Sequence, residues 1–221
     1  MPNLNNQPLR GLLLSAAVAA GAWLQAGPAL AQADSTLTVA GGCFWCVEAD
    51  FERVTGVTEA VSGYTGGSVE NPTYREVTRG GTGHYEAVEI MYDSDVVDRR
   101  RLLNLFFRSI DPTDAGGQFC DRGESYRTAV FVASEEERQM AEAAKAAAEA
   151  ELGQEIVTPI LDLAEFYEAE DYHQDYYKGE QIVLTRGGPK SQASAYKFYR
   201  EGCRRDERIR ELWGDDAPFL P

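Results

Sequence analysis

The 221-residue sequence has few cysteines and histidines, and it has no apolar segment as long as a typical membrane span. It contains four cysteines and two histidines. Its longest apolar, uncharged stretch covers residues 11–24, whereas a helix needs about 20 such residues to cross a bilayer. We therefore expect no stable membrane association.

Basic residues are also scarce relative to acidic ones. The chain has 21 Lys and Arg against 36 Asp and Glu, which gives a formal net charge of −15. Such a surface repels nucleic acid and anionic lipid, so we expect neither as a partner. Hydrophobic residues make up 43% of the chain, which argues against disorder and for a folded core.

The first 33 residues have the pattern of a cleaved secretory signal. Arg10 precedes the apolar stretch 11–24, and small residues follow at Ala29, Ala31 and Ala33. We predict cleavage after Ala31 or Ala33 and export, most simply to the periplasm. No cysteine lies near the cleavage region, which argues against a lipid-modified N-terminus.

Residues 34–221 should form one catalytic domain, and we expect a monomer. Residues 35–42, 57–67, 85–93, 126–134 and 155–163 read as strands. Helices are predicted from Cys43 to just before Gly56, over 98–110 and 134–153, and in part of 197–214. Because these elements are interleaved, the fold class is α/β (α+β): a single-domain two-layer sandwich with a mixed sheet, flanking helices and a ferredoxin-like core.

Two cysteines lie three residues apart in the segment GGCFWC, residues 41–46. Cys43 stands where a Gly-Gly turn meets a predicted helix. The free amides and the positive dipole end of a helix start favour thiolate over thiol. Phe44 and Trp45 beside this nucleophile would make an apolar slot suited to a small group such as a methyl.

Other uses of these cysteines must be weighed. A zinc site needs a second pair of closely spaced ligands. No two of the remaining candidates are close in sequence: Cys120, Cys203, His84 and His173. We therefore expect no metal. The exported Cys-x-x-Cys pair could instead serve dithiol–disulfide exchange. A non-catalytic binding protein stapled by disulfides is a third alternative.

Glu86 is the candidate acid. It opens the predicted strand 85–93, just after a glycine-rich turn. In an apolar pocket the pKa of this carboxyl would rise, so that it could deliver a proton.

Six segments in order, GGCFWCVE, SGYTGG, NPTYREV, GTGHYEAVEI, FCDRGESYRTAV and EDYHQDYY, resemble the A-type peptide methionine sulfoxide reductases of the GCFWC variety. The resemblance implies reduction of methionine S-sulfoxide, in oxidised proteins and as the free amino acid. It implies no bound cofactor and an external, thioredoxin-like dithiol as reductant. It assigns catalysis to Cys43, Glu86, Tyr74, Tyr126 and Asp121, and substrate binding to Phe44, Trp45, His173 and Tyr176.

The sulfenic acid that such a reaction leaves on Cys43 needs a second thiol to resolve it. Cys46, one helical turn away, is the first candidate. Cys203 in the C-terminal tail is the second, and Cys120 is the third. A relay from a Cys43–Cys46 disulfide to Cys203 is a further alternative that the sequence leaves open.

Overall fold

The computed structural model describes residues 35–215 and 217–221. The predicted signal peptide and its cleavage region lie outside the described residues. Within this part of the chain, no helix combines the length and the apolar character that crossing a membrane requires.

Strands and helices alternate along the described chain. The strands are β1 (Ser35–Gly41), β2 (Val57–Thr65), β3 (Tyr85–Tyr92), β4 (Gly117–Gln118), β5 (Asp121–Arg122), β6 (Thr128–Val132), β7 (Ile160–Asp162), β8 (Tyr167–Glu168), β9 (Ile182–Thr185) and β10 (Gly188–Ser191). The helices are α1 (Phe44–Phe51), α2 (Tyr74–Arg79), α3 (Arg99–Phe107), α4 (Glu135–Leu152), α5 (Gln192–Gly202) and α6 (Arg205–Trp213). Short 3-10 helices lie at Glu124–Tyr126, Asp171–His173 and Tyr176–Lys178.

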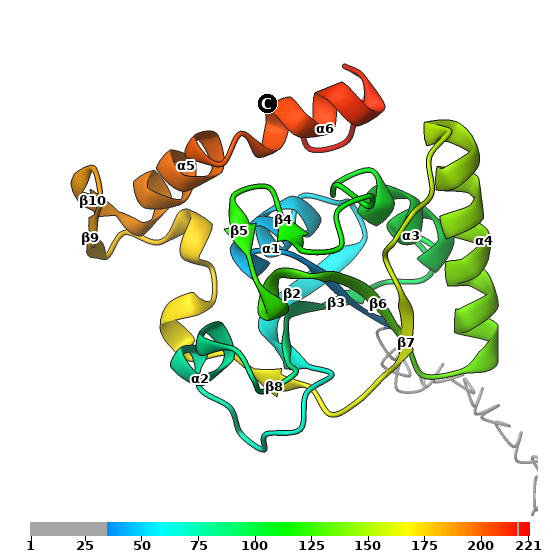
Figure 1. Ribbon diagram of the computed structural model, residues 1–221, viewed down its shortest axis with the longest axis horizontal. Helices are drawn as coiled ribbons and strands as arrows, with labels where there is room; N and C mark the ends of the chain where they lie inside the picture. The colour runs from blue at the N-terminus through cyan, green and yellow to red at the C-terminus, as the bar shows by residue number, and fades with distance from the viewer. Residues whose placement is uncertain (1–34, 216) are drawn as a thin grey trace, which may run out of the picture. The chain divides into compact units, whose positions relative to one another are not determined.

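Among the described residues, six strands form one mixed sheet in the order β7-β6-β1-β3-β2-β8 (Figure 1). Neighbouring strands are antiparallel except β6 and β7, which are parallel. The order β6-β1-β3-β2, with α1 and α3 in the two crossovers, is that of a split βαβ or ferredoxin-like unit. The predicted mixed sheet, flanking helices and ferredoxin-like core are therefore confirmed.

The main core lies between the sheet and the helices α1, α3 and α4. Side chains alternate along β3, so Val88 and Ile90 enter this core, whereas Ala87 joins a smaller cluster on the opposite face. Glu86 has the same parity as Val88. It therefore points to the helix side of the sheet, at the end of β3 that lies beside the start of α1.

Helix ends follow the capping signals in the sequence. Ser134 accepts a hydrogen bond from the N–H of Glu137, and Asp98 accepts one from Arg101, so α4 and α3 begin directly after these residues. Gly153 ends α4 in the left-handed conformation, with φ 67°.

Two predicted elements differ from the structure. In the predicted strand 155–163, only Ile160–Asp162 pairs with β6, because the N–H of Val157 donates to a loop carbonyl, that of Pro112, instead. The strand lies at the sheet edge, where a proline such as Pro159 just before it is tolerated. The tail contains two helices, α5 and α6, separated at Arg204, which has φ 55°.

Candidate active site

One cavity of about 480 Å³ is lined by all four cysteines of the chain. Its walls come from the start of α1, from α2, β3 and the β4–β5 hairpin, and from α5 and α6. The cavity brings together most of the predicted site residues: Cys43, Phe44, Trp45, Cys46, Tyr74, Glu86, Asp121, Tyr126, Tyr176, Cys120 and Cys203. His173 lies behind Trp45 rather than in the cavity wall.

The start of α1 holds Cys43 as predicted, but the first free amide of the helix serves the acid rather than the sulfur. Cys43 is the N-cap residue of α1, and the N–H of Phe44 donates to Glu86 Oε2 at 3.1 Å. A hydrogen bond shared with Cys46, together with burial, raises the pKa of Cys43 well above its usual value. The expectation that the helix start makes Cys43 the thiolate therefore does not hold for this arrangement.

Cys46 is the more acidic thiol of the pair. The hydrogen bond with Cys43 lowers the pKa of Cys46 to about 7, against the opposing effect of burial. The positive charges of Arg205 and Arg200 lower it further. The two thiols are thus linked by one hydrogen bond, which raises the pKa of Cys43 and lowers that of Cys46. Both thiols are free, whereas the other two cysteines are bonded to each other.

Glu86 is a buried carboxylic acid. Its side chain is 1% exposed, and burial raises the pKa of Glu86 to about 8, in spite of the hydrogen bond from Phe44. The negative charge of Asp121 raises this pKa further. At neutral pH the carboxyl therefore keeps its proton. Its Oε1 is buried and has no hydrogen-bond partner among the described residues, so one oxygen of the acid is available to a ligand in the cavity.

Two tyrosines and a second carboxyl complete the polar wall. Tyr74 is the first residue of α2, and Tyr126 ends the 3-10 helix Glu124–Tyr126. Burial and the nearby Glu86 raise the pKa of both phenols, so both keep their protons. Burial also raises the pKa of Asp121, and the positive charge of Arg205 partly offsets this effect.

An aromatic cluster fixes the indole of Trp45. Tyr176 stacks on it with ring centroids 3.7 Å apart and planes 4° from parallel. Trp45 Nε1 donates to His173 Nδ1 at 3.2 Å. Burial lowers the pKa of His173 to about 4, so this imidazole is neutral and can accept the bond. His173 and Tyr176 thus hold Trp45 in place, and Phe44, 1% exposed, packs against His173.

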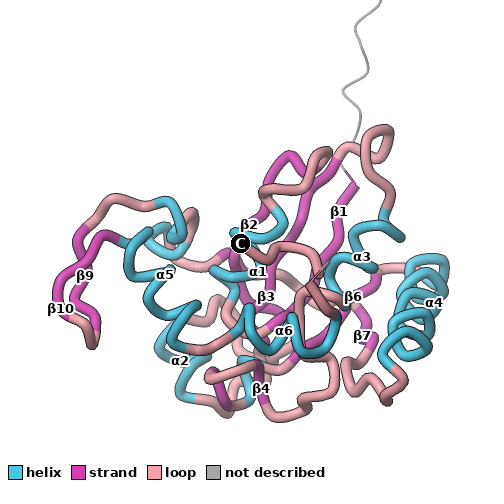
Figure 2. The backbone as a smooth tube through the Cα atoms, turned by 90° about the horizontal axis from the view of Figure 1, so that it is seen from above, coloured by secondary structure: helices cyan, strands magenta, loops and turns pink. Residues whose placement is uncertain are grey.

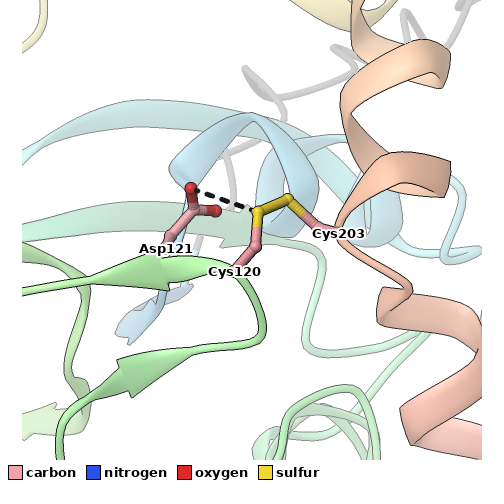
Figure 3. Close-up of a disulfide and its surroundings, with 3 residues drawn as sticks. All are labelled: Cys120, Asp121 and Cys203. Atoms are coloured by element: carbon pink, nitrogen blue, oxygen red, sulfur yellow. Dashed lines mark hydrogen bonds between the residues drawn. A yellow bond between two sulfur atoms is a disulfide. The ribbon is translucent and has the colours of Figure 1, made fainter.

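Cys120 and Cys203 form a disulfide at the mouth of the same cavity (Figure 3). Cys120 lies in the turn of the β4–β5 hairpin, and Cys203 lies between α5 and α6. Cys120 Sγ is 3.9 Å from Asp121 Oδ1. The bond therefore joins the hairpin that carries Asp121 to the C-terminal helices. As long as it exists, Cys46 is the free thiol that accompanies Cys43.

Sequence reasoning missed Arg205, the most deeply placed base of the cavity. It is 2% exposed, its guanidinium donates to the carbonyls of Gly41 and Ser109, and it lies over the ring of Phe119 at 4.6 Å. Its Nε is buried without a hydrogen-bond partner. The arginine-rich run 204–210 gave no signal of which side chain would point inward.

Glu170 was also missed, although it organises the start of α2. Glu170 Oε1 accepts from the N–H of Tyr74 at 3.1 Å, and Oε2 accepts from the hydroxyl of Tyr64 at 3.0 Å. This carboxylate therefore fixes the backbone from which the Tyr74 phenol enters the cavity. Its distance along the sequence from Tyr74 explains why no local pattern revealed it.

Comparisons with known proteins all point to one family. Residues 35–207 match the family described as peptide methionine sulfoxide reductase. Peptide methionine sulfoxide reductase MsrA 2 of Rhizobium meliloti is 46% identical over 190 residues, which are 86% of this chain and 89% of that protein. The MsrA of Bacillus subtilis is 48% identical over 179 residues, covering 80% and 94%. The structure of methionine sulfoxide reductase A of Corynebacterium diphtheriae superposes with a TM-score of 0.60 at 31% identity, covering 72% of this chain and 84% of that one.

Proposed function

The chain belongs to the peptide methionine sulfoxide reductase family and reduces methionine sulfoxide, and we propose that Cys43 is the nucleophile and Glu86 the proton donor of this reaction. One observation carries the assignment. A free thiol and a protonated, buried carboxyl line one cavity, and one oxygen of that carboxyl has no partner. A sulfoxide requires both, because its sulfur accepts the nucleophile and its oxygen must be protonated.

The first step begins with transfer of the Cys43 proton to Cys46 along their shared hydrogen bond. The Cys43 thiolate then attacks the sulfoxide sulfur, and Glu86 protonates the oxygen as the S–O bond breaks. The hydroxyls of Tyr74 and Tyr126 stabilise the charge on that oxygen. The attack forms a bond between the two sulfurs, and the protonated oxygen leaves as hydroxide. This hydroxide attacks Cys43 Sγ and breaks the new S–S bond, so methionine leaves, reduced by two electrons, and Cys43 is oxidised by two electrons to the sulfenic acid.

The second step forms a disulfide. The Cys46 thiol attacks the Cys43 sulfenic acid, water leaves and a Cys43–Cys46 disulfide results. An external thioredoxin-type dithiol reduces this bond, and no prosthetic group takes part. A second route passes the oxidation to Cys203, but it requires prior reduction of the Cys120–Cys203 bond.

The aromatic wall accounts for selectivity between the two sulfoxide epimers. A methyl group against Trp45 and an oxygen directed at Glu86 fix two of the substituents on sulfur. Only one epimer can then direct the rest of the methionine side chain out of the cavity. Following the family resemblance, we assign the S epimer to this site and place Asp121 near the reacting oxygen as an accessory carboxyl.

A substrate assay tests the proposed reaction. The purified protein is given the S and R epimers of a methyl sulfoxide with dithiothreitol, and loss of each epimer is followed by chiral chromatography. We expect the S epimer to disappear and the R epimer to persist. Consumption of neither epimer, combined with reduction of insulin disulfides, would instead identify a dithiol–disulfide oxidoreductase.

Cys46→Ser tests the resolving role. This variant should release one methionine per enzyme molecule and then stop in the sulfenic state, which dimedone labels. Normal cycling of Cys46→Ser with a thioredoxin-type reductant would show that another thiol resolves Cys43. Mass spectrometry of the oxidised wild-type protein then identifies the partner of Cys43.

The cellular setting is a separate part of the proposal. We propose that residues 1–33 direct export to the periplasm, where oxidised proteins are the substrates, and that the enzyme works as a monomer. The support is the sequence pattern of Arg10, the apolar stretch 11–24 and the alanines that follow. N-terminal sequencing of the protein recovered from cell fractions tests export, and light scattering tests the monomer. A cytoplasmic protein that retains residue 1 would contradict export.

A further inference from the structure

The β9–β10 hairpin projects beyond the six-stranded sheet and carries exposed apolar side chains. Both views place it beside α5 at the end of the molecule away from α4 (Figures 1 and 2). Ile182 and Leu184 of β9 are 67% and 84% exposed. Both lie on the same strand face, because Val183 and Thr185 point to the other side, toward α5.

The two strands of this hairpin pair only with each other among the described residues. The outer edge of β9 therefore presents backbone N–H and C=O groups that no neighbouring strand occupies. An open strand edge with exposed apolar side chains is a template for the addition of another extended segment.

The hairpin also differs from the rest of the chain in charge. Residues 181–200 contain four bases, Arg186, Lys190, Lys197 and Arg200, and no acid, in a chain of net charge −15. Arg200 is held by Asp50 and Asp206. Arg186, in the turn of the hairpin, has no ion pair with any described residue and is exposed, so its charge is available to an acidic partner.

The hairpin is continuous with the catalytic cavity. Arg186, in the turn between β9 and β10, lines the cavity that contains Cys43. With about 3.3 Å of rise per strand residue, Leu184 lies about 7 Å and Ile182 about 13 Å beyond Arg186 along β9. A substrate segment that leaves the cavity past Arg186 would reach both side chains within about four to five of its own residues.

We propose that the outer face and edge of β9 bind the extended segment that flanks methionine sulfoxide in an oxidised protein. This proposal rests on the proposed function, since it supplies the part of the substrate that the cavity itself is too small to hold. The apolar face of Ile182 and Leu184 selects apolar residues in that segment, and the basic turn selects acidic ones. The surface has no role for free methionine sulfoxide, which ends inside the cavity.

The double variant Ile182→Ser, Leu184→Ser tests the proposal. The value of kcat/KM is measured with an unfolded, methionine-oxidised protein and with free methionine S-sulfoxide, both with dithiothreitol as reductant. We expect about a tenfold loss on the protein and no change on the free amino acid. Val96→Ser, a substitution of a 56% exposed side chain on the turn before α3, is the matched control and should change neither value.

Peptides sharpen the test. Two peptides carry one methionine sulfoxide and identical apolar residues, one with aspartates and the other with lysines five positions away. The wild type should prefer the aspartate peptide by about fivefold at low salt, and added salt should remove this preference. Arg186→Glu, which reverses the charge of the turn, should reduce this preference.

Several outcomes would overturn the proposal. Equal losses on protein and free substrate would show that the hairpin shapes the cavity instead. Unchanged reduction of the protein, with slower recycling by a thioredoxin-type reductant, would assign the surface to the reductant. Failure of the proposed function is distinguishable, because the wild type would then not consume free methionine sulfoxide.

Discussion

The two cysteine pairs line one cavity, yet different kinds of structure hold them. Cys43 and Cys46 lie on one turn of α1, above the central strands of the sheet, so their proximity follows from three residues of helix. Cys120 and Cys203 are 83 positions apart and join a hairpin to the tail helices. The first pair is therefore built into the core, whereas the second depends on where the C-terminal helices pack.

The two pairs therefore have different roles: the first takes part in the reaction, and the second positions residues around it. The core pair has Glu86, Tyr74 and Tyr126 around it, and so it carries the reaction. The second pair positions Asp121 on one side and the start of α6, with Arg205, on the other. Substitutions in the two pairs should consequently change different measurements.

The largest expected effect is at the nucleophile. Cys43→Ser should reduce sulfoxide turnover by about 10⁴-fold or more, because a serine hydroxyl is a much weaker nucleophile than a thiolate. Cys203→Ser should still release one methionine per enzyme molecule in the absence of reductant. Single-turnover assays that quantify methionine by chromatography check both variants. Full activity of Cys43→Ser would contradict the assignment of the reaction to the Cys43–Cys46 pair.

A smaller loss is expected at the acid. Glu86→Gln should slow the reduction step by about 10²–10⁴-fold, because the amide cannot supply the proton. In the wild type this rate should rise through pH about 7, as the thiol pair ionises, and fall through about 8, as Glu86 loses its proton. Stopped-flow measurements across this range check the profile. If the reduction rate of Glu86→Gln fell over the same pH range, a group other than Glu86 would cause the fall.

The second pair should affect stability more than chemistry. Cys203→Ser should lower the free energy of unfolding by about 2–4 kcal/mol, because the disulfide closes a long loop of the unfolded chain. Cys46→Ser, which breaks no covalent bond, should cost about 1 kcal/mol or less. Urea titrations of both variants without reductant measure the difference. Equal stabilities would show that the Cys120–Cys203 bond is not a structural tie.

The smallest expected effect links the two pairs through Arg205. Arg205→Met should raise the pKa of Cys46, because the positive charge that lowers it is removed. A rise of about one pKa unit would slow alkylation of Cys46 by up to about tenfold at a pH below its pKa. Iodoacetamide kinetics against pH, in a Cys43→Ser background, provide the measurement.

Two further variants isolate the charge of Arg205 from its packing. Arg204→Met changes the exposed neighbour, which pairs with Glu207, and should leave the alkylation profile unchanged. Arg205→Lys should restore part of the lost reactivity. If Cys46 has the same pKa in Arg205→Met and in Arg204→Met, the charge of Arg205 does not affect Cys46.

Local patterns predicted the part of the site that the core builds. Gly-Gly before Cys43 indicated the helix start, and the glycine-rich turn before the strand 85–93 placed Glu86 at the start of that strand. Ser134 and Gly153 located α4 because a cap is a property of adjacent residues. In each case the deciding interaction spans only a few positions.

Contacts between distant segments could not be predicted in this way. The pairing of Cys120 with Cys203, the inward direction of Arg205 and the bond from Glu170 to Tyr74 depend on how separate segments pack. The β9–β10 hairpin was missed because its residues do not alternate between apolar and polar, which is the pattern from which a strand is predicted. The opposite pKa shifts of Cys43 and Cys46 were also missed, because they depend on the hydrogen bond between the two thiols and on their burial.

That amide has a consequence for the end of the catalytic cycle. Before the reaction, the N–H of Phe44 donates a hydrogen bond to the protonated carboxyl of Glu86. This bond favours loss of the proton only weakly. Once the proton has gone to the departing oxygen, the same N–H faces a carboxylate, and a charge-assisted bond replaces a neutral one. The helix start thus stabilises the charge that catalysis creates.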